Sequence, residues 1–562
     1  MQIKRIIAAS LVFVMLFSFS GCMNRSEEDP NSNSDVMEED ELVIYHNNTE
    51  LSEGLMALAE EYSRSTGKKV TSQLASGGVF SEAESGGALF VVDTKNDLSG
   101  MHSGGFFADL MNDLGFSGVI SKIPAGLQLN SNGLGSYGIP LMLEGYGYIF
   151  DREMLGALFG EENAVSLSRD LKNCSFTEFE GFCAAVDTYI SSPSAAKITV
   201  NGTEYTFAEN KTGKAANLTG VFSLNYESAE AAKAILSTAL AAKFASRYDI
   251  ISANETDIGG MKDLLSAFTE VLDLHTKSIA GAEGSISRGE EFSGGDYNYS
   301  TAIDLFTRGN ALFYPGGTSD AADFEKSSEG FGTDLDIMPF KLPVSESDIT
   351  ASGMSAEKLD RSIVIGSRYY LAVNPNASKE LSSAAKDFIS WLYEDDEGKT
   401  AYSSAFGGIP HSFEYTAGNT EENTESRPES ENSALENSSE PGIEGKERAG
   451  IEKKSSGSLA EGSSAEENPM GENEETPGIN TEFVPSHRLE KSLTARVAEY
   501  YASGSWVPDM SIAFPGDWSE DVLAEELMDF FGMETWSDDD RKGFINELIE
   551  GWKDRMEKDE ES

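Results

Sequence analysis

The sequence predicts an α/β fold in which buried strands alternate with amphipathic helices. The run Leu42-Val-Ile-Tyr45 is typical of a buried strand, and apolar residues then recur at helical spacing over 51–62, before Gly67 ends the pattern. Further strand-like runs follow at 69–71 and 89–92. Because strand and helix patterns alternate, we expect a largely parallel sheet with helical crossovers.

Later segments add a hairpin and four helices. The alternating stretch 198–207 surrounds an Asn-Gly pair, which is a strong signal for a two-residue hairpin turn. Helical patterns cover about 227–246 and 257–279. Near the end, Ser519 and Ser537 each precede an apolar helical pattern, so we expect each serine to cap a helix.

The first residues have the pattern of an export signal. Two cationic residues precede an apolar run from Ile6 to about Phe19, and roughly 14 residues are too few to cross a membrane that needs about 20. The segment Phe19-Ser20-Gly21-Cys22 resembles a bacterial lipobox. We predict a lipoprotein signal peptide at 1–21, a lipid on Cys22 that anchors the chain to the outer face of the cell membrane, and a flexible stalk at 22–40. The alternative is an ordinary signal peptide with an incidental cysteine.

A change in composition marks an insert at 416–482. This stretch holds 17 Glu, five Lys or Arg and no aromatic residue. Such a segment cannot bury enough apolar surface to offset the entropy of ordering, so we predict a disordered acidic insert. Helix-compatible sequence resumes at Phe483, and the insert therefore interrupts the fold instead of ending it.

Charge and motifs narrow the function classes. A formal net charge of −54 argues against nucleic acid or anionic lipid as a partner. After Cys22 only Cys174 and Cys183 remain, either as small apolar residues or as a bridge, and the five histidines show no metal-ligand spacing. No nucleophile elbow, phosphate loop or dinucleotide motif occurs. We therefore predict no metal, no cofactor and no enzymatic activity.

Four segments in order along the chain carry a family resemblance. They are 42–48 with the ending Tyr62-x4-Gly67-x2-Val70, the segment 139–155, the segment 306–317, and the segment 374–392. Together they resemble the extracellular solute-binding proteins of ATP-driven (ABC) importers, in the carbohydrate-binding branch that includes the maltodextrin-binding protein. The resemblance covers nearly all of 41–552 except the acidic insert and about 194–226.

The resemblance implies a two-lobed, periplasmic-binding-protein-like (type II) fold with hinge crossings. It places lobe 1 at 41–143 and 366–415, and lobe 2 at 144–365 and 483–556. It implies that a carbohydrate, and more narrowly an oligosaccharide, is captured between the closing lobes and passed to a membrane permease. The anchor on Cys22 would keep the receptor near that permease.

Several residues are candidates for the ligand site. Glu144 matches an acidic residue that binds sugar in the family, although a solvated or hinge-paired carboxylate would have the same sequence. The family often places a sugar-stacking ring where this chain has the loop containing Trp506 and Trp518. From the residues themselves, we add polar groups that follow strand ends, Asn47, Asn48 and Asp93, and two rings that are candidates for lining the cleft, Tyr45 and Tyr146. Turn chemistry for the asparagines and core packing for the tyrosines are the alternatives.

Two positions depart from the family pattern, and other functions stay open. Ser319 stands where the family often has a stacking tryptophan, and Thr49-Glu50 stands where the maltodextrin-binding protein uses an Asp-Lys pair. Both differences argue against maltodextrin itself. The alternatives are a receptor for a peptide or polyamine, or a surface-anchored glycan hydrolase. A cleft with clustered carboxylates and no aromatic rings would favour a cationic ligand.

Overall fold

The computed structural model describes most of the chain from Glu41 onward. The described residues are 41–94, 101, 104–113, 115–129, 136–227, 229–327, 334–406, 488–515 and 517–561. From Leu42 the chain forms one compact unit. The predicted signal peptide, the lipid on Cys22, the stalk and the acidic insert lie outside the described residues. Within the described ranges, no helix is both long enough and apolar enough to cross a membrane.

Lobe 1 is built on a five-stranded sheet, which we call sheet A. Its order is β2-β1-β3-β14-β4, with β1 at Leu42–His46, β2 at Val70–Leu74, β3 at Leu89–Asp93, β14 at Tyr369–Val373 and β4 at Ile139–Pro140. The strand β1 is parallel to β2 and β3, as the alternation of strands and helices predicts. The strand β14 is antiparallel to β3 and β4.

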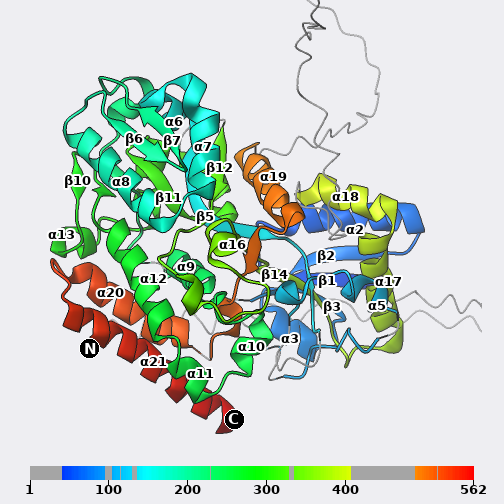
Figure 1. Ribbon diagram of the computed structural model, residues 1–562. Helices are drawn as coiled ribbons and strands as arrows, with labels where there is room; N and C mark the ends of the chain where they lie inside the picture. The colour runs from blue at the N-terminus through cyan, green and yellow to red at the C-terminus, as the bar shows by residue number, and fades with distance from the viewer. Residues whose placement is uncertain are drawn as a thin grey trace, which may run out of the picture. The chain divides into compact units, whose positions relative to one another are not determined.

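Helices cover sheet A with their apolar faces. They are α2 (Ser52–Thr66), α3 (Val79–Glu84), α5 (Ser117–Ile120), α17 (Lys379–Glu394) and α18 (Asp396–Phe406). The helix α2 ends at Gly67, whose φ of 74° is left-handed and whose N–H donates to Ser63 O. Tyr62 of α2 meets Phe388 and Trp391 of α17 edge to face, which joins the two helices in one core. Figure 1 shows α2 and α18 in contact beside these strands.

Lobe 2 is built on a larger, mixed sheet, which we call sheet B. Its order is β10-β9-β8-β11-β5-β13-β15, and β12 also pairs with β5. The strands are β5 (Glu144–Asp151), β8 (Gly220–Phe222), β9 (Ile279–Ala280), β10 (Ser285–Ile286), β11 (Ala311–Gly317), β12 (Leu335–Met338), β13 (Ile363–Gly366) and β15 (Trp506–Pro508). The strand β5 is antiparallel to β11, β12 and β13. The expectation of a largely parallel sheet therefore fails here, because the chain enters this lobe along β5 and leaves it in the opposite direction along β13.

The helices of lobe 2 pack around sheet B and form its main core. The longer ones are α6 (Arg152–Phe159), α7 (Ala164–Asn173), α8 (Phe176–Ser191), α9 (Glu230–Leu240), α12 (Lys262–His275), α14 (Tyr299–Thr307), α15 (Ala321–Ser327), α20 (Ala524–Gly532) and α21 (Asp538–Glu561). Shorter turns are α10 (Arg247–Ile251), α11 (Glu255–Gly259), α13 (Glu290–Ser293) and α16 (Ala356–Asp360). The helix α21 packs on α11 and α12, and Figure 1 shows α20 and α21 in red beside them.

The predicted hairpin is confirmed, and one of the two predicted caps is not. The strands β6 (Lys197–Val200) and β7 (Thr203–Thr206) are antiparallel around Asn201 and Gly202, whose φ angles of 48° and 77° fit a two-residue hairpin turn. Ser537 accepts the N–H of Asp540 and so caps α21. Ser519 instead begins a π-helical turn, Ser519–Leu523, that runs into α20, and its hydroxyl donates to Glu520.

The two lobes are joined by neighbouring crossings. One runs from β4 to β5 through 141–143, and the other returns from β13 to β14 through Ser367 and Arg368. The first crossing is hydrogen-bonded to the start of β14, where the second one ends, since Leu141 N donates to Tyr369 O at 2.8 Å. The helix α19 (Arg488–Ser503) contributes to both cores, with Leu493 in one and Val497 in the other. The α/β class and the two-lobed arrangement predicted from the sequence are thus confirmed.

Candidate functional site

A pocket of about 400 Å³ lies where the crossings meet lobe 2. Glu50 and Arg368 line it from the loop after β1 and from the return crossing, and the other described lining residues come from lobe 2. Its volume is within the range of about 300–1,000 Å³ that is usual for small-molecule sites. The lining from lobe 2 comprises residues of β5, of the segment after β8, of β11 and the segment after it, and of α9, α12, α14 and α20.

Glu144 and Tyr146 form one wall of the pocket. Both belong to β5 and lie two residues apart, so their side chains point to the same face of the strand. Tyr146 Oη donates to Glu144 Oε2 at 2.6 Å. The ring of Tyr146 lies against the backbone of β11, since a Cβ at Gly317 would come within 2.7 Å of it. Burial, together with the neighbouring Glu144, raises the pKa of Tyr146 well above its usual value, so this hydroxyl stays protonated.

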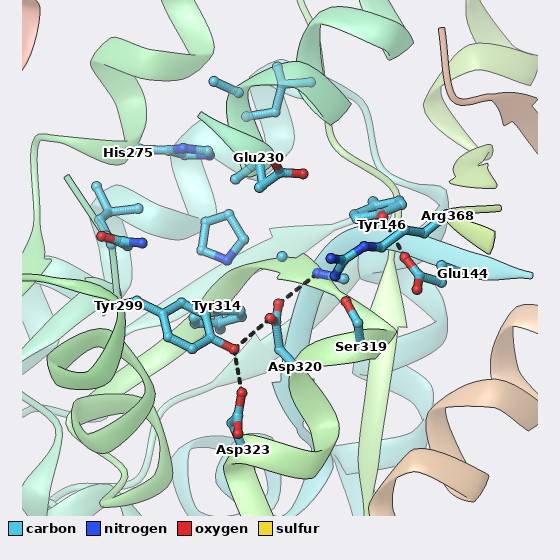
Figure 2. Close-up of a pocket in the computed structure, with 18 of the residues that line it drawn as sticks. Glu144, Tyr146, Glu230, His275, Tyr299, Tyr314, Ser319, Asp320, Asp323 and Arg368 are labelled. Carbon is cyan, nitrogen blue, oxygen red and sulfur yellow. Dashed lines mark hydrogen bonds between the residues drawn. The ribbon is translucent and has the colours of Figure 1, made fainter. Parts of the chain in front are cut away.

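Arg368 brings a positive charge to the same wall. Its Nε and Nη2 donate to the carboxylate of Asp93, which is 2% exposed, at 2.8–3.2 Å. Burial alone would lower the pKa of Arg368, but its hydrogen bonds to Asp93 and the charge of that carboxylate outweigh burial and raise it. Asp93 therefore holds the guanidinium in place at the edge of the pocket. Figure 2 shows Arg368 next to Tyr146 and Glu144.

Two aspartates and two tyrosines form the opposite wall. Tyr299 Oη lies 2.9 Å from Asp320 Oδ1 and 2.8 Å from Asp323 Oδ2. Gly317 N donates to Asp320 Oδ2 at 3.0 Å, and Tyr314 lies beside the same carboxyl. Burial raises the pKa of Asp320 despite these hydrogen bonds, and burial next to both aspartates raises the pKa of Tyr299. Figure 2 shows Tyr299 between the two carboxylates.

The structure brings only two of the sequence-predicted residues, Glu144 and Tyr146, into the lining. The candidates at the strand ends of lobe 1 do not line the pocket. Asp93 is hydrogen-bonded to Arg368, which does line it, and Asn48 Nδ2 donates to the hydroxyl of Tyr369. Asn47 is half-buried directly after β1. The ring of Tyr45 stacks on Phe90 with centroids 5.8 Å apart, which is packing within lobe 1.

The two tryptophans lie outside the pocket lining. Trp506 is half-buried in β15, where its ring stacks on Tyr501 at 5.7 Å. The expectation for Trp518 is wrong, because its side chain is 1% exposed and packs against Trp552 at 4.7 Å. Its Nε1 donates to Leu548 O at 3.1 Å, which satisfies the indole inside the core of lobe 2. The loop that carries it folds back onto α21, so no face of the ring is left for a ligand.

Sequence reasoning missed most of the pocket. The residues that it did not single out for ligand binding include Glu230, His275, Tyr299, Tyr314, Asp320, Asp323 and Arg368. One signal was present for Arg368, since a charged residue interrupts the apolar run of the return crossing. Another was present for Asp320, which follows the glycine pair of the third family-like segment by three positions. Among the described residues, no three His, Cys, Asp or Glu side chains are arranged to hold a metal ion.

A buried histidine in lobe 2 should make the stability of the protein depend on pH. Burial lowers the pKa of His275 to about 3, whereas it is about 6.5 in an unfolded chain. As the pH falls, His275 is therefore protonated in the unfolded state before it is protonated in the folded state. The stability that neutral His275 contributes is fully present above about pH 6.5 and is lost as the pH falls toward 3. Between pH 7.5 and pH 5 we expect this one group to remove about 2 kcal/mol from the free energy of unfolding.

Urea unfolding of the wild type and of His275→Gln at both pH values checks this expectation. The variant should lose about 2 kcal/mol less than the wild type over the same interval, because glutamine does not titrate. Equal losses in the two proteins would show that His275 is not held neutral by the fold.

Comparisons with known proteins found similar solved structures but no matching sequence family. No protein-family model matches the chain, and no curated protein sequence matches it. The fold is similar to that of a family 1 extracellular solute-binding protein from Bifidobacterium longum subsp. infantis, with 14% identity, a TM-score of 0.41, and 67% of this chain and 83% of that one covered. It is also similar to that of apo RafE from Streptococcus pneumoniae, with 13% identity and a TM-score of 0.47. That match covers 92% of this chain and 98% of the other.

Proposed function

We propose that this chain is a lipid-anchored extracytoplasmic receptor that captures a carbohydrate between its lobes and delivers it to the permease of an ABC importer. The observation that carries the proposal is the composition of the pocket: carboxylates, one guanidinium and tyrosine rings face one cavity from both sides. Carboxylates and guanidinium groups bind paired sugar hydroxyls, and rings cover the weakly apolar C–H faces. We include in this proposal the two lobes with the boundaries predicted from the sequence, and the lipid anchor on Cys22.

The ligand would bind by contacting both lobes. Glu144 and Tyr146 belong to the first strand of lobe 2, whereas Arg368 is fixed by Asp93 of β3 in lobe 1. A sugar that accepts from Arg368 and donates to Glu144 would therefore link the two lobes. Because a ligand shifts a conformational equilibrium by its differential contacts, such a ligand would favour the closed arrangement that an importer recognises.

A second candidate is a receptor for an organic cation such as a polyamine. Among the described residues, five carboxyl side chains line the pocket, namely those of Glu50, Glu144, Glu230, Asp320 and Asp323, against the single guanidinium of Arg368. Such an excess of negative charge favours a positively charged ligand. The rings of Tyr146, Tyr299 and Tyr314 in the same lining suit the C–H faces of a sugar, and the guanidinium of Arg368 would repel an organic cation.

A thermal-shift panel tests the proposal. Purified protein should unfold at a higher temperature in the presence of at least one saccharide, because a ligand that binds only the folded state stabilises it by RT ln(1 + [L]/Kd). The panel should include neutral oligosaccharides, polyamines and peptides at equal concentrations. Stabilisation by a polyamine or peptide but by no saccharide would contradict the carbohydrate assignment. Release of shorter sugars from a stabilising glycan would instead indicate a hydrolase.

A further inference from the structure

The pocket has an apolar end as well as its polar walls. This end is lined by side chains from four segments of lobe 2: Leu224, Ala232, Ile235, Leu272 and Phe531. All five belong to the main core of that lobe and are between 1% and 8% exposed. Residues 232 and 235 lie one turn apart on α9, which packs on α12. The cavity thus reaches from the charged groups of the crossings into the core of lobe 2.

His275 lines the same end of the pocket. It follows Leu272 by one turn on α12, and its ring lies 4.7 Å from that of Phe222. Figure 2 shows it on the side of Glu230, across the pocket from Asp323. Among the described residues its ring makes one hydrogen bond, between Nε2 and Tyr148 Oη at 2.8 Å, so Nδ1 has no protein partner there. One hydrogen-bonding atom is therefore available next to the apolar side chains of this end.

The side chains at this end of the pocket disfavour a charged ligand group and also a ligand group that has no apolar part. Burial keeps the imidazole neutral by lowering its pKa to about 3, so Nδ1 donates in one tautomer and accepts in the other. The carboxylate on this side of the pocket, Glu230, already pairs with Lys233 at 2.8 Å, so an ammonium group placed here would lose water and gain little net opposite charge. A bare hydroxyl would leave the apolar walls without a partner. A secondary amide with a methyl group suits both features, since the amide donates and accepts and the methyl group is apolar.

On the basis of the proposed carbohydrate-binding function, we infer that the ligand is a sugar bearing an acetamido group, with the methyl group among Leu224, Ile235 and Leu272 and the amide next to His275. The hydroxyls of the same sugar then face the polar walls, toward Glu144, Arg368 and Asp320. The acetamido group would be the main determinant of specificity, because the polar walls present groups that suit hydroxyls of many sugars.

Matched sugars that differ only at one substituent test this inference. Binding of N-acetylglucosamine, glucose and glucosamine to the full-length protein would be measured by titration calorimetry, together with the corresponding set of galactose configuration. We expect the acetamido sugar to bind about tenfold tighter or more than its hydroxyl and amino counterparts in at least one configuration, from burial of one methyl group and one hydrogen bond.

Variants at the apolar end locate the preference. Ala232→Leu places extra atoms in the space assigned to the methyl group, and His275→Gln replaces the ring that faces the amide. In each variant the ratio of the two dissociation constants should fall toward one. If hydroxyl or amino sugars bind as tightly as acetamido sugars to the wild type, the acetamido inference is wrong while the carbohydrate proposal stands. If the wild type binds no saccharide of any kind, the proposed function itself fails.

Discussion

Replacing Glu144 by glutamine should weaken saccharide binding by about 10- to 150-fold. A hydrogen bond to a charged group contributes about 1.5–3 kcal/mol, and each 1.4 kcal/mol is a factor of ten in affinity. Glutamine keeps an oxygen that can accept from Tyr146 Oη, so the local hydrogen bond is retained and only the charge is lost. The measurement is the dissociation constant for whichever saccharide stabilises the wild type.

Glu357→Gln is the matched control for this change. Glu357 lies on α16, and its largely exposed side chain pairs with Arg361. The control should bind the saccharide as the wild type does. An unchanged dissociation constant in Glu144→Gln, with normal unfolding by urea, would show that the carboxylate of Glu144 does not contact the ligand.

Replacing Trp518 by alanine should destabilise the protein by about 3–5 kcal/mol, because a buried ring is removed and a cavity remains. The ring packs against Trp552 and Phe514, and its indole N–H is bonded to the backbone of α21. Urea unfolding gives the change in free energy. Trp506→Ala is the comparison, since its ring is only half-buried and should cost less.

Saccharide binding separates a core role of Trp518 from a ligand role. Trp518→Phe keeps most of the apolar volume and should leave the affinity for saccharide close to that of the wild type, while lowering stability. A large loss of affinity in Trp518→Phe, without loss of the folded state, would restore Trp518 as a ligand-stacking residue.

The sequence predicted the elements of the fold better than the walls of the pocket, and the reason is the range of the interactions. Local patterns were sufficient for α2, whose apolar spacing and terminal glycine both appear in the structure. They were also sufficient for the hairpin at Asn201-Gly202. The mixed direction of sheet B was missed, because the pairing of β5 with β13 joins residues more than two hundred positions apart.

The site shows the same limit. Glu144 and Tyr146 were found because the segment that carries them has a recognisable pattern of its own. Asp93 was placed at the correct strand end, yet it acts through Arg368, a residue 275 positions later in the chain. Trp518 was misplaced because the loop that precedes it contains prolines and looks exposed. Only the packing of that loop on Trp552 shows that the ring is buried.

The most direct test of the account is a crystal structure of the protein with the saccharide that stabilises it most. We expect the sugar to lie in the pocket beside β5, within hydrogen-bond distance of Glu144 and Arg368 and with a ring face against a tyrosine. A saccharide bound elsewhere on the protein, with this pocket holding only water, would contradict the account.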